Sequence, residues 1–191
     1  ARYVFDHAQQ YGIKLKILDI GGGFVHKQPL LNEVSHAISE ALDQYFEDIN
    51  PLNVIAEPGR FMVSNVCDLF VSIIGKKKNT NQIKYYINDS VYGSFNCKIF
   101  DYATFQFDIY RQQGNWESNQ IIISNEKGQW INQRGEIHDG CNLPSTIFGA
   151  TCDSLDVIIE NMEMPELEIG DYLCFHNMGA YTISSASEFN G

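Results

Sequence analysis

A thiol and a carboxylate lie side by side at Cys152 and Asp153, in a glycine-containing turn between two apolar segments. A turn of this kind favours an exposed, reactive cysteine that can move a proton, and the neighbouring carboxylate can hold an amine. The commoner alternative for a single cysteine is an inert buried thiol. The pair therefore predicts acid catalysis on a molecule that carries an amine.

Two other turns could hold an electron-poor ring and its phosphate. The turn Glu57-Pro58-Gly59-Arg60 closes the apolar run 54–56. Its carboxylate could pair with a protonated ring nitrogen and make the ring an electron sink, or it could form a strand-end salt bridge. The run Gly21-Gly22-Gly23 follows an earlier apolar segment, and glycine lets backbone N–H groups approach a phosphate. Phosphates often bind at the last two loops of a βα-barrel, although plain tight turns would look alike.

The segments that carry these turns change from alternating helices and strands to strands alone along the chain. Residues 1–10 resemble the end of a helix, 15–20 a parallel strand buried on both faces, and 31–46 a helix with an apolar stripe. Residues 53–56 form the next short strand. This order predicts an α/β part, either the end of a βα-barrel or of a doubly wound sheet.

After Arg60 the chain reads as an all-β domain, with the boundary near 61–66, so that the domains are 1–62 and 63–191. The segment 111–144 is rich in Gln, Asn, Gly and Ser and is expected to be a loop or excursion. Asp101 would lie at a strand end, where a solvated carboxylate is the default. The strand-like segments are 61–74, 83–88, 91–100, 121–124, 157–159 and 171–175.

The composition limits the function classes. A formal net charge of −11 argues against nucleic-acid or anionic-membrane binding, and the one basic run, 76–78, is expected to be a solvated loop. The apolar runs are too short to span a bilayer. The five cysteines form no CxxC pair and no Cys/His metal spacing, which predicts reduced thiols in a cytoplasmic protein and no metal. Both ends of the chain look cut, so we expect a fragment.

Five motifs occur together in the order found in one family. They are Leu18-Asp19-Ile20-Gly21-Gly22-Gly23-Phe24, Ala56-Glu57-Pro58-Gly59-Arg60, Asn88-Asp89-Ser90-Val91-Tyr92-Gly93-Ser94-Phe95-Asn96, Cys152-Asp153-Ser154-Leu155-Asp156 and Asn177-Met178-Gly179-Ala180-Tyr181-Thr182. Together they resemble eukaryotic ornithine decarboxylase, a barrel-fold decarboxylase that depends on pyridoxal phosphate. The resemblance covers the chain from Ala1 to Gly191 apart from 111–144. It implies the end of a (β/α)8 barrel followed by a C-terminal β-sheet domain.

The resemblance also implies an activity and roles for single residues. The full-length chain would convert L-ornithine to putrescine and CO2 in polyamine biosynthesis, whereas this fragment alone would be inactive. Two subunits of a homodimer would share each active site. Cys152 would return a proton to the substrate carbon, Asp101 and Asp153 would hold the distal ammonium, and Tyr92, Phe100 and Phe189 would line the site. The cofactor-binding residues would be Gly23, Glu57, Pro58, Gly59, Arg60 and Tyr181.

Some positions depart from the family pattern. The lysine that carries the cofactor in this family has no counterpart among the nine lysines of the chain. Val25-His26 replaces the usual Pro-Gly, Phe100 replaces a Tyr, and Tyr102 replaces a His. One alternative is a non-enzymatic homologue that resembles antizyme inhibitors and binds antizyme. We prefer the enzyme because Glu57, Arg60, Cys152 and Asp153 are all present. A pure interaction module is a third hypothesis, but it leaves the cysteine–carboxylate pair unexplained.

Overall fold

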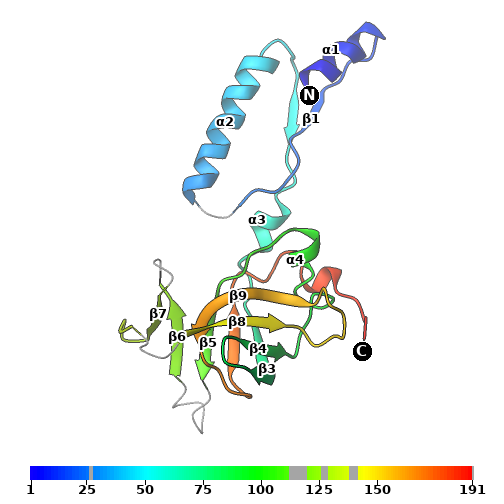
Figure 1. Cartoon of the computed structure of the whole chain (residues 1–191). Helices are drawn as coiled ribbons and strands as arrows, with labels where there is room; N and C mark the ends of the chain where they lie inside the picture. Colours follow the sequence, from blue (N-terminus) through cyan, green and yellow to red (C-terminus); the bar gives the residue numbers. More distant parts are fainter. Residues whose placement is uncertain (26–27, 112–119, 126–128, 138–141, 191) are drawn as a thin grey trace. The chain divides into compact units, whose positions relative to one another are not determined.

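The computed structural model describes residues 1–25, 28–111, 120–125, 129–137 and 142–190 (Figure 1). Two compact units are distinguished, a first unit, Ala1–Ser64, and a sheet unit, Asn65–Gly191. The first unit contains helices and parallel strands, and the second is built on one large sheet, which confirms the predicted α/β and all-β parts. In the described ranges no helix is both long enough and apolar enough to cross a bilayer.

The first unit is a strand–helix–strand arrangement. Its strands β1 (Ile17–Asp19) and β2 (Asn53–Ile55) pair in parallel, and α2 (Gln28–Phe46) connects them. A helical crossover is the usual connection between parallel neighbours. The helix α1 (Arg2–Gln10) contacts the end of α2 through the buried rings of Phe5 and Phe46, whose centroids are 5.2 Å apart. The short helix α3 (Gly59–Val63) follows β2.

The expected burial of the first strand on both faces is wrong for this chain. Ile17 in β1 is 59% exposed, and Val54 and Ile55 in β2 are 40% and 49% exposed. Parallel strands become buried only where further strands and helices cover them. Within the described part of the chain, β1 and β2 pair with each other in a two-stranded sheet.

The sheet unit contains an eight-stranded mixed sheet in the order β7-β6-β5-β10-β3-β4-β8-β9. Neighbouring strands run antiparallel except β4 and β8, which pair in parallel. A short helix, α4 (Cys97–Phe100), and a 3-10 turn, η2 (Ile183–Ser185), lie outside the sheet. The strands are β3 (Leu69–Lys78), β4 (Ile83–Ile87), β5 (Phe107–Arg111), β6 (Gln120–Ser124), β7 (Trp130–Asn132), β8 (Asn142–Phe148), β9 (Val157–Pro165) and β10 (Tyr172–Phe175).

Alternating residues of these strands form the core. In β4, Ile83, Tyr85 and Ile87 are fully buried, and in β10 Leu173 and Phe175 are as well. The buried Tyr85 hydroxyl accepts a hydrogen bond from the Leu167 N–H at 2.9 Å, so the buried oxygen has a hydrogen-bond partner. The period of two along each strand therefore places one apolar face against the core.

Three sequence predictions in this unit are wrong. Residues 61–63 belong to α3, so the strand predicted over 61–74 begins only at Leu69. The segment 91–100 is a turn followed by α4, because Asp89 and Ser90 accept hydrogen bonds that close the turn; Asp101 therefore follows a helix. The basic run 76–78 ends β3, where Lys76 pairs with Glu166 and Glu168.

The strand predicted over 121–124 is confirmed as β6, whereas the expectation that the rest of 111–144 forms a loop or excursion is wrong where the structure describes it. The described part of the segment also contains β7 and the start of β8, and Ile122 and Trp130 are buried. Residues 112–119, 126–128 and 138–141 of this segment lie outside the described residues.

Candidate active site

The turn that carries Cys152 and Asp153 joins β8 to β9 and is organised around the carboxylate of Asp156. Asp156 is 1% exposed and accepts hydrogen bonds from the Thr151 N–H at 2.9 Å and the Thr151 hydroxyl at 2.7 Å. Its other oxygen accepts from the Val91 N–H at 2.9 Å. The buried carboxyl group of Asp156 therefore fixes the turn through three hydrogen bonds.

A second loop, residues 88–96, packs beside this turn. The Asp89 carboxylate accepts from the Ser90 and Ser94 N–H groups at 2.7 and 2.9 Å, and the Asp89 carbonyl accepts from Ala150 N–H at 3.0 Å. Gly93 lies so close that a Cβ there would stand 2.3 Å from Asp89 Oδ1. The loop therefore holds Tyr92, between Asp89 and Gly93, next to the cysteine turn.

Tyr92 and Asp153 are in direct contact, because the Tyr92 hydroxyl donates a hydrogen bond to Asp153 Oδ2. The other oxygen, Oδ1, accepts from the Leu155 N–H at 2.9 Å. The Leu155 hydrogen bond first, and the Tyr92 hydrogen bond second, hold the pKa of Asp153 below its ordinary value. The same contact raises the pKa of Tyr92. A carboxylate kept ionised in this way is suited to an ammonium group.

The thiol and an aromatic ring complete this group. Phe189 lies against Tyr92 with ring centroids 4.3 Å apart, and the Ser187 N–H donates to the Tyr92 carbonyl at 2.8 Å. The exposed thiol of Cys152 contacts Asn190 Oδ1 at 3.8 Å. The structure thus brings four of the predicted site residues together. We call Tyr92, Cys152, Asp153 and Phe189 the Cys152 cluster.

The other predicted residues of the sheet unit lie on separate segments. Phe100 ends α4 with 77% of its side chain exposed, and Asp101 follows it as the C-terminal cap. Tyr181 has a positive φ of 55° and is half exposed between buried Ala180 and Thr182. The Asn96 amide donates to the Thr182 carbonyl at 2.6 Å, which ties this segment to the loop that carries Tyr92.

In the first unit the two glycine turns lie side by side at the carboxyl ends of β1 and β2. The Ile20 N–H donates to the Ile55 carbonyl at 3.0 Å, and the Glu57 N–H donates to the Gly21 carbonyl at 2.8 Å. The second hydrogen bond continues the pairing of β1 and β2 into the two turns. A Cβ on Gly22 would stand 2.5 Å from the Glu57 carbonyl oxygen, so only glycine allows this approach. The predicted adjacency of the two turns is therefore present.

These turns fit the pyridine ring and phosphate of pyridoxal phosphate. Gly23 has a φ of 82°, and no described heavy atom lies within 4 Å of the place where a Cβ would stand on Gly23 or Gly59. Open space beside glycine backbone suits a phosphate. The Glu57 carboxylate is exposed, and Pro58 and Arg60 are half-buried at the start of α3. A carboxylate, a guanidinium and an open glycine turn could hold the ring nitrogen and the phosphate of such a cofactor, whereas the lysine that carries it in this family has no counterpart in the chain.

Sequence reasoning missed the residues that hold the Cys152 cluster in place. Asp156 and Asp89 belong to recognised motifs, but nothing in the sequence distinguishes a buried, hydrogen-bonded aspartate from an exposed one. Glycine is the available signal: Gly93 and Gly149 each face one of these carboxylates at a distance no side chain permits. Asn190, next to Phe189, was likewise not predicted as a neighbour of the thiol.

Comparison with known proteins agrees with this geometry. Residues 3–179 match the family model described as "Pyridoxal-dependent decarboxylase, C-terminal sheet domain". The chain is 37% identical to antizyme inhibitor 2 of Xenopus laevis and 36% identical to ornithine decarboxylase of Mus musculus, in each case over 100% of this chain and 40% of the relative. A crystal structure of the arginine decarboxylase of Paramecium bursaria Chlorella virus, bound to agmatine, matches with a TM-score of 0.76 and 32% identity, over 100% of this chain and 46% of that one. The chain therefore spans about 40% of the length of these curated relatives.

Proposed function

The chain belongs to the pyridoxal-dependent decarboxylase family, and we propose that the complete protein of which it is part decarboxylates L-ornithine to putrescine. The family membership and its cofactor class confirm the resemblance seen in the sequence. The contact between Tyr92 and Asp153 beside the Cys152 thiol carries the more specific proposal, because it combines an ammonium-binding carboxylate with a proton donor.

In this proposal the first unit binds the cofactor. Glu57 pairs with the pyridine nitrogen, and the glycine turn with Gly23, the Pro58-Gly59 turn and Arg60 surround the phosphate. When bound, pyridoxal phosphate withdraws electrons from the α-carbon of an amino acid, so that its carboxylate can leave as CO2. Glu57 supports this withdrawal by keeping the ring nitrogen protonated.

The sheet unit recognises the substrate and supplies the proton. Asp153, together with Asp101, binds the distal ammonium of ornithine, and its lowered pKa keeps it ionised. Cys152 donates its thiol proton to the α-carbon after CO2 has left. Tyr92 and Phe189 line the aliphatic part of the substrate and exclude water. Phe100, which ends α4 on a separate segment, is proposed as a further lining residue. In a homodimer, Cys152 and Asp153 of one subunit would serve the barrel of the other.

Ornithine is proposed over longer or branched substrates because the cluster offers a simple carboxylate for a simple ammonium. A guanidinium would engage a carboxylate through two parallel hydrogen bonds, but both Asp153 oxygens already accept from protein donors, Oδ2 from Tyr92 and Oδ1 from Leu155. An ammonium can bind through one hydrogen bond to one oxygen, so it needs fewer of the remaining acceptor sites on Asp153. The structural neighbour that binds agmatine is an arginine decarboxylase. The proposal is therefore tested by comparing ornithine with lysine and arginine as substrates.

The test uses the complete protein loaded with pyridoxal phosphate. Carboxyl-labelled ornithine, lysine and arginine are supplied separately, and released CO2 is measured together with the amine product. We expect ornithine to give the highest kcat/KM. Asp153→Ala should raise the KM for ornithine strongly while cofactor binding stays intact, and Glu163→Gln, an exposed carboxylate on β9, should change neither value. Equal turnover of lysine and ornithine, or an unchanged KM in Asp153→Ala, would overturn the proposed substrate clamp.

A second candidate function rests on the 37% identity with an antizyme inhibitor. A protein of this kind would bind antizyme and release no CO2 from any of the three amino acids. The same assay distinguishes the candidates, provided that antizyme binding is measured in parallel. Binding without turnover, together with no cofactor uptake, would favour the inhibitor.

A further inference from the structure

Four side chains gather on one face of the sheet at the end of β10, away from any residue used above. The register pairs Cys174 with Phe70 of β3 on one side and with Asp108 of β5 on the other. Residues two apart along a strand share a face, and directly paired residues do so too. Asp68, Asp108, Cys174 and His176 are therefore brought to one face although they are up to 108 positions apart.

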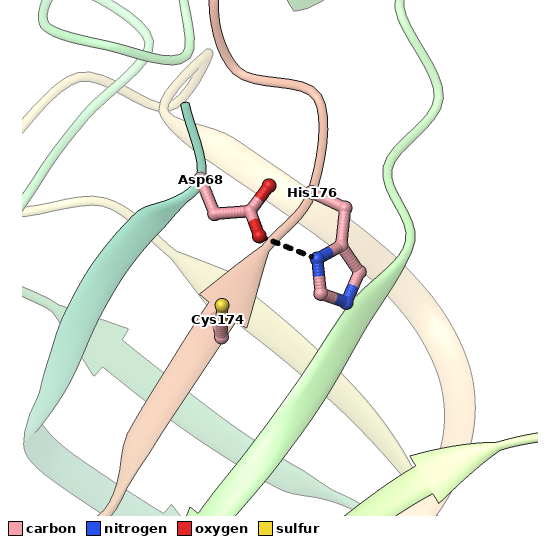
Figure 2. A group of neighbouring side chains, drawn as sticks. All are labelled: Asp68, Cys174 and His176. Atoms are coloured by element: carbon pink, nitrogen blue, oxygen red, sulfur yellow. Dashed lines mark hydrogen bonds and ion pairs between the residues drawn. The ribbon is translucent and has the colours of Figure 1, made fainter. Parts of the chain in front are cut away.

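The donor atoms of three of these residues converge. Figure 2 shows the Asp68 carboxylate and the His176 ring pointing toward one another, with Cys174 on β10 beside them. The distance from His176 Nδ1 to Asp68 Oδ2 is 3.0 Å, and the donor atoms of Asp68, Cys174 and His176 all lie within 4.8 Å of one another. In tetrahedral zinc sites, nitrogen and oxygen ligands about 2.0 Å from the metal lie about 3.3 Å apart. Small shifts of the side chains would therefore complete such a geometry.

The second ring nitrogen of His176 has the partner that a metal-binding histidine requires. Nε2 lies 3.1 Å from Asp108 Oδ2. A hydrogen bond from Nε2–H to this carboxylate leaves the lone pair on Nδ1, directed at Asp68 and Cys174. Carboxylates in this position orient metal-binding histidines and raise their basicity. Asp68 Oδ1 accepts from the Asn177 N–H at 3.1 Å, which holds that carboxylate in place as well.

We propose that Asp68, Cys174 and His176 form a binding site for a divalent metal of the zinc type, with Asp108 as the carboxylate that orients His176. The combination of thiolate, imidazole and carboxylate is typical of zinc, and softer or harder ions prefer more uniform donors. One thiolate and one carboxylate neutralise the two charges of the ion. Three protein ligands leave a fourth position that a water molecule could fill.

Zinc deprotonates a coordinating thiol outright, so metal binding would release the thiol proton of Cys174. The metal would then join the start of β3 to the end of β10.

The test uses the complete, cofactor-loaded protein after treatment with a reductant and a chelator that is then removed. Cobalt(II) is titrated as a spectroscopic probe for zinc, because thiolate coordination gives a sulfur-to-cobalt charge-transfer band in the near ultraviolet. We expect one ion per chain with this band, and displacement of cobalt by zinc. Cys174→Ser should abolish the band, and Asp108→Asn should weaken metal affinity about 10- to 100-fold.

Two other cysteines serve as matched controls. Cys67 is exposed next to Asp68, and Cys97 is buried in α4. Neither forms a disulfide, and Cys67→Ser and Cys97→Ser should leave the band and the affinity unchanged. Circular dichroism verifies that Cys174→Ser is folded, and His176→Asn provides a second variant that should also lose tight binding. A band that survives Cys174→Ser, or the absence of stoichiometric cobalt binding by the folded wild-type protein, would overturn the proposal.

Discussion

Gly149 and Asp156 fit against each other so closely that a Cβ on Gly149 would stand 2.1 Å from Asp156 Oδ1. The Gly149 N–H also donates to the Asp156 carbonyl at 2.9 Å. The two residues bracket the turn with Cys152 and Asp153, so the position of the proposed catalytic groups depends on a buried carboxylate that touches no substrate.

Asp156→Asn should destabilise the protein by about 1–3 kcal/mol. Val91 and Thr151 donate to different oxygens of Asp156, and an asparagine has only one oxygen, so its NH2 group would face one of these backbone N–H donors. Chemical denaturation of the complete protein measures this free energy of unfolding. Glu160→Gln, an exposed carboxylate on the same strand, β9, is the control and should change stability by less than about 0.5 kcal/mol. Equal stability of the two variants would show that the buried carboxylate does not support the turn.

Tyr92→Phe should raise the KM for ornithine by roughly threefold, the equivalent of one lost hydrogen bond. It should also shift the acidic limb of the kcat/KM profile to higher pH. The sign follows from the contact: the Tyr92 hydroxyl stabilises the ionised form of Asp153, so its removal raises the pKa of that carboxyl. Tyr86→Phe, at a tyrosine that stacks on Phe148 of β8, is the control. An unshifted acidic limb would mean that Asp153 does not bind the ammonium.

Cys152→Ala should lower kcat by about 100-fold, the lower range for loss of a positioned proton donor. A proton that arrives from elsewhere should also reach the wrong atom, so that part of the substrate becomes an aldehyde in place of putrescine and its α-amino group stays on the cofactor as pyridoxamine phosphate. Product analysis by mass spectrometry measures this ratio. Cys67→Ala, at another exposed cysteine, should behave as the wild type. Clean putrescine formation at the normal rate would make the Cys152 thiol structural.

The ion pairs between β3 and the segment after β9 should give a pH-dependent contribution to stability. Lys78 and Lys76 lie 2.5 and 2.9 Å from Glu166, and their hydrogen bonds hold the pKa of Glu166 below its ordinary value of 4.5. A depressed folded-state pKa stabilises the protein above pH 4.5, and this stabilisation is lost as the pH falls through the folded pKa. Because Glu166 is about one-third exposed, Glu166→Gln should cost no more than about 1 kcal/mol at pH 7. A cost that is the same at pH 3 and pH 7 would contradict this.

The 191-residue chain expressed alone should neither release CO2 from ornithine nor bind pyridoxal phosphate stoichiometrically. Ile17, Val54 and Ile55 are each at least 40% exposed on the two-stranded sheet of the first unit, which favours association through these faces. Light scattering should detect aggregates, and the complete protein is the control. CO2 release by the isolated chain would overturn the assigned roles.

Local patterns predicted those parts of the fold that local interactions determine. The apolar stripe of 31–46 becomes α2, and the β-branched run at Ile83 becomes β4. The segment 91–100 misled the prediction because Val91 and Phe95 look like strand residues, yet they reach the core from a turn and are 1% and 0% exposed. Intrinsic β-propensity could not anticipate the hydrogen bonds that backbone N–H groups of this segment donate to Asp89 and Asp156, which lie outside it.

The candidate site was predicted as far as family motifs name its residues. Their mutual contacts, such as Tyr92 with Asp153, depend on a loop and a turn 61 positions apart. The group of Asp68, Cys174 and His176 has no spacing signature at all, because it arises from the pairing of β3 and β10. Chemistry that depends on strand register is invisible until the register is known.

The place of β10 in the sheet has a consequence for synthesis on the ribosome. β10 is the last strand in sequence, yet it lies between β3 and β5 and pairs with both. Until residues 172–175 emerge, β5–β7 and the strands β3, β4, β8 and β9 have no shared partner, and their inner edges remain unpaired. Such late, long-range closure slows folding and leaves nascent chains prone to association. A chaperone that shields strand edges would therefore be needed most until residues 172–175 have been translated.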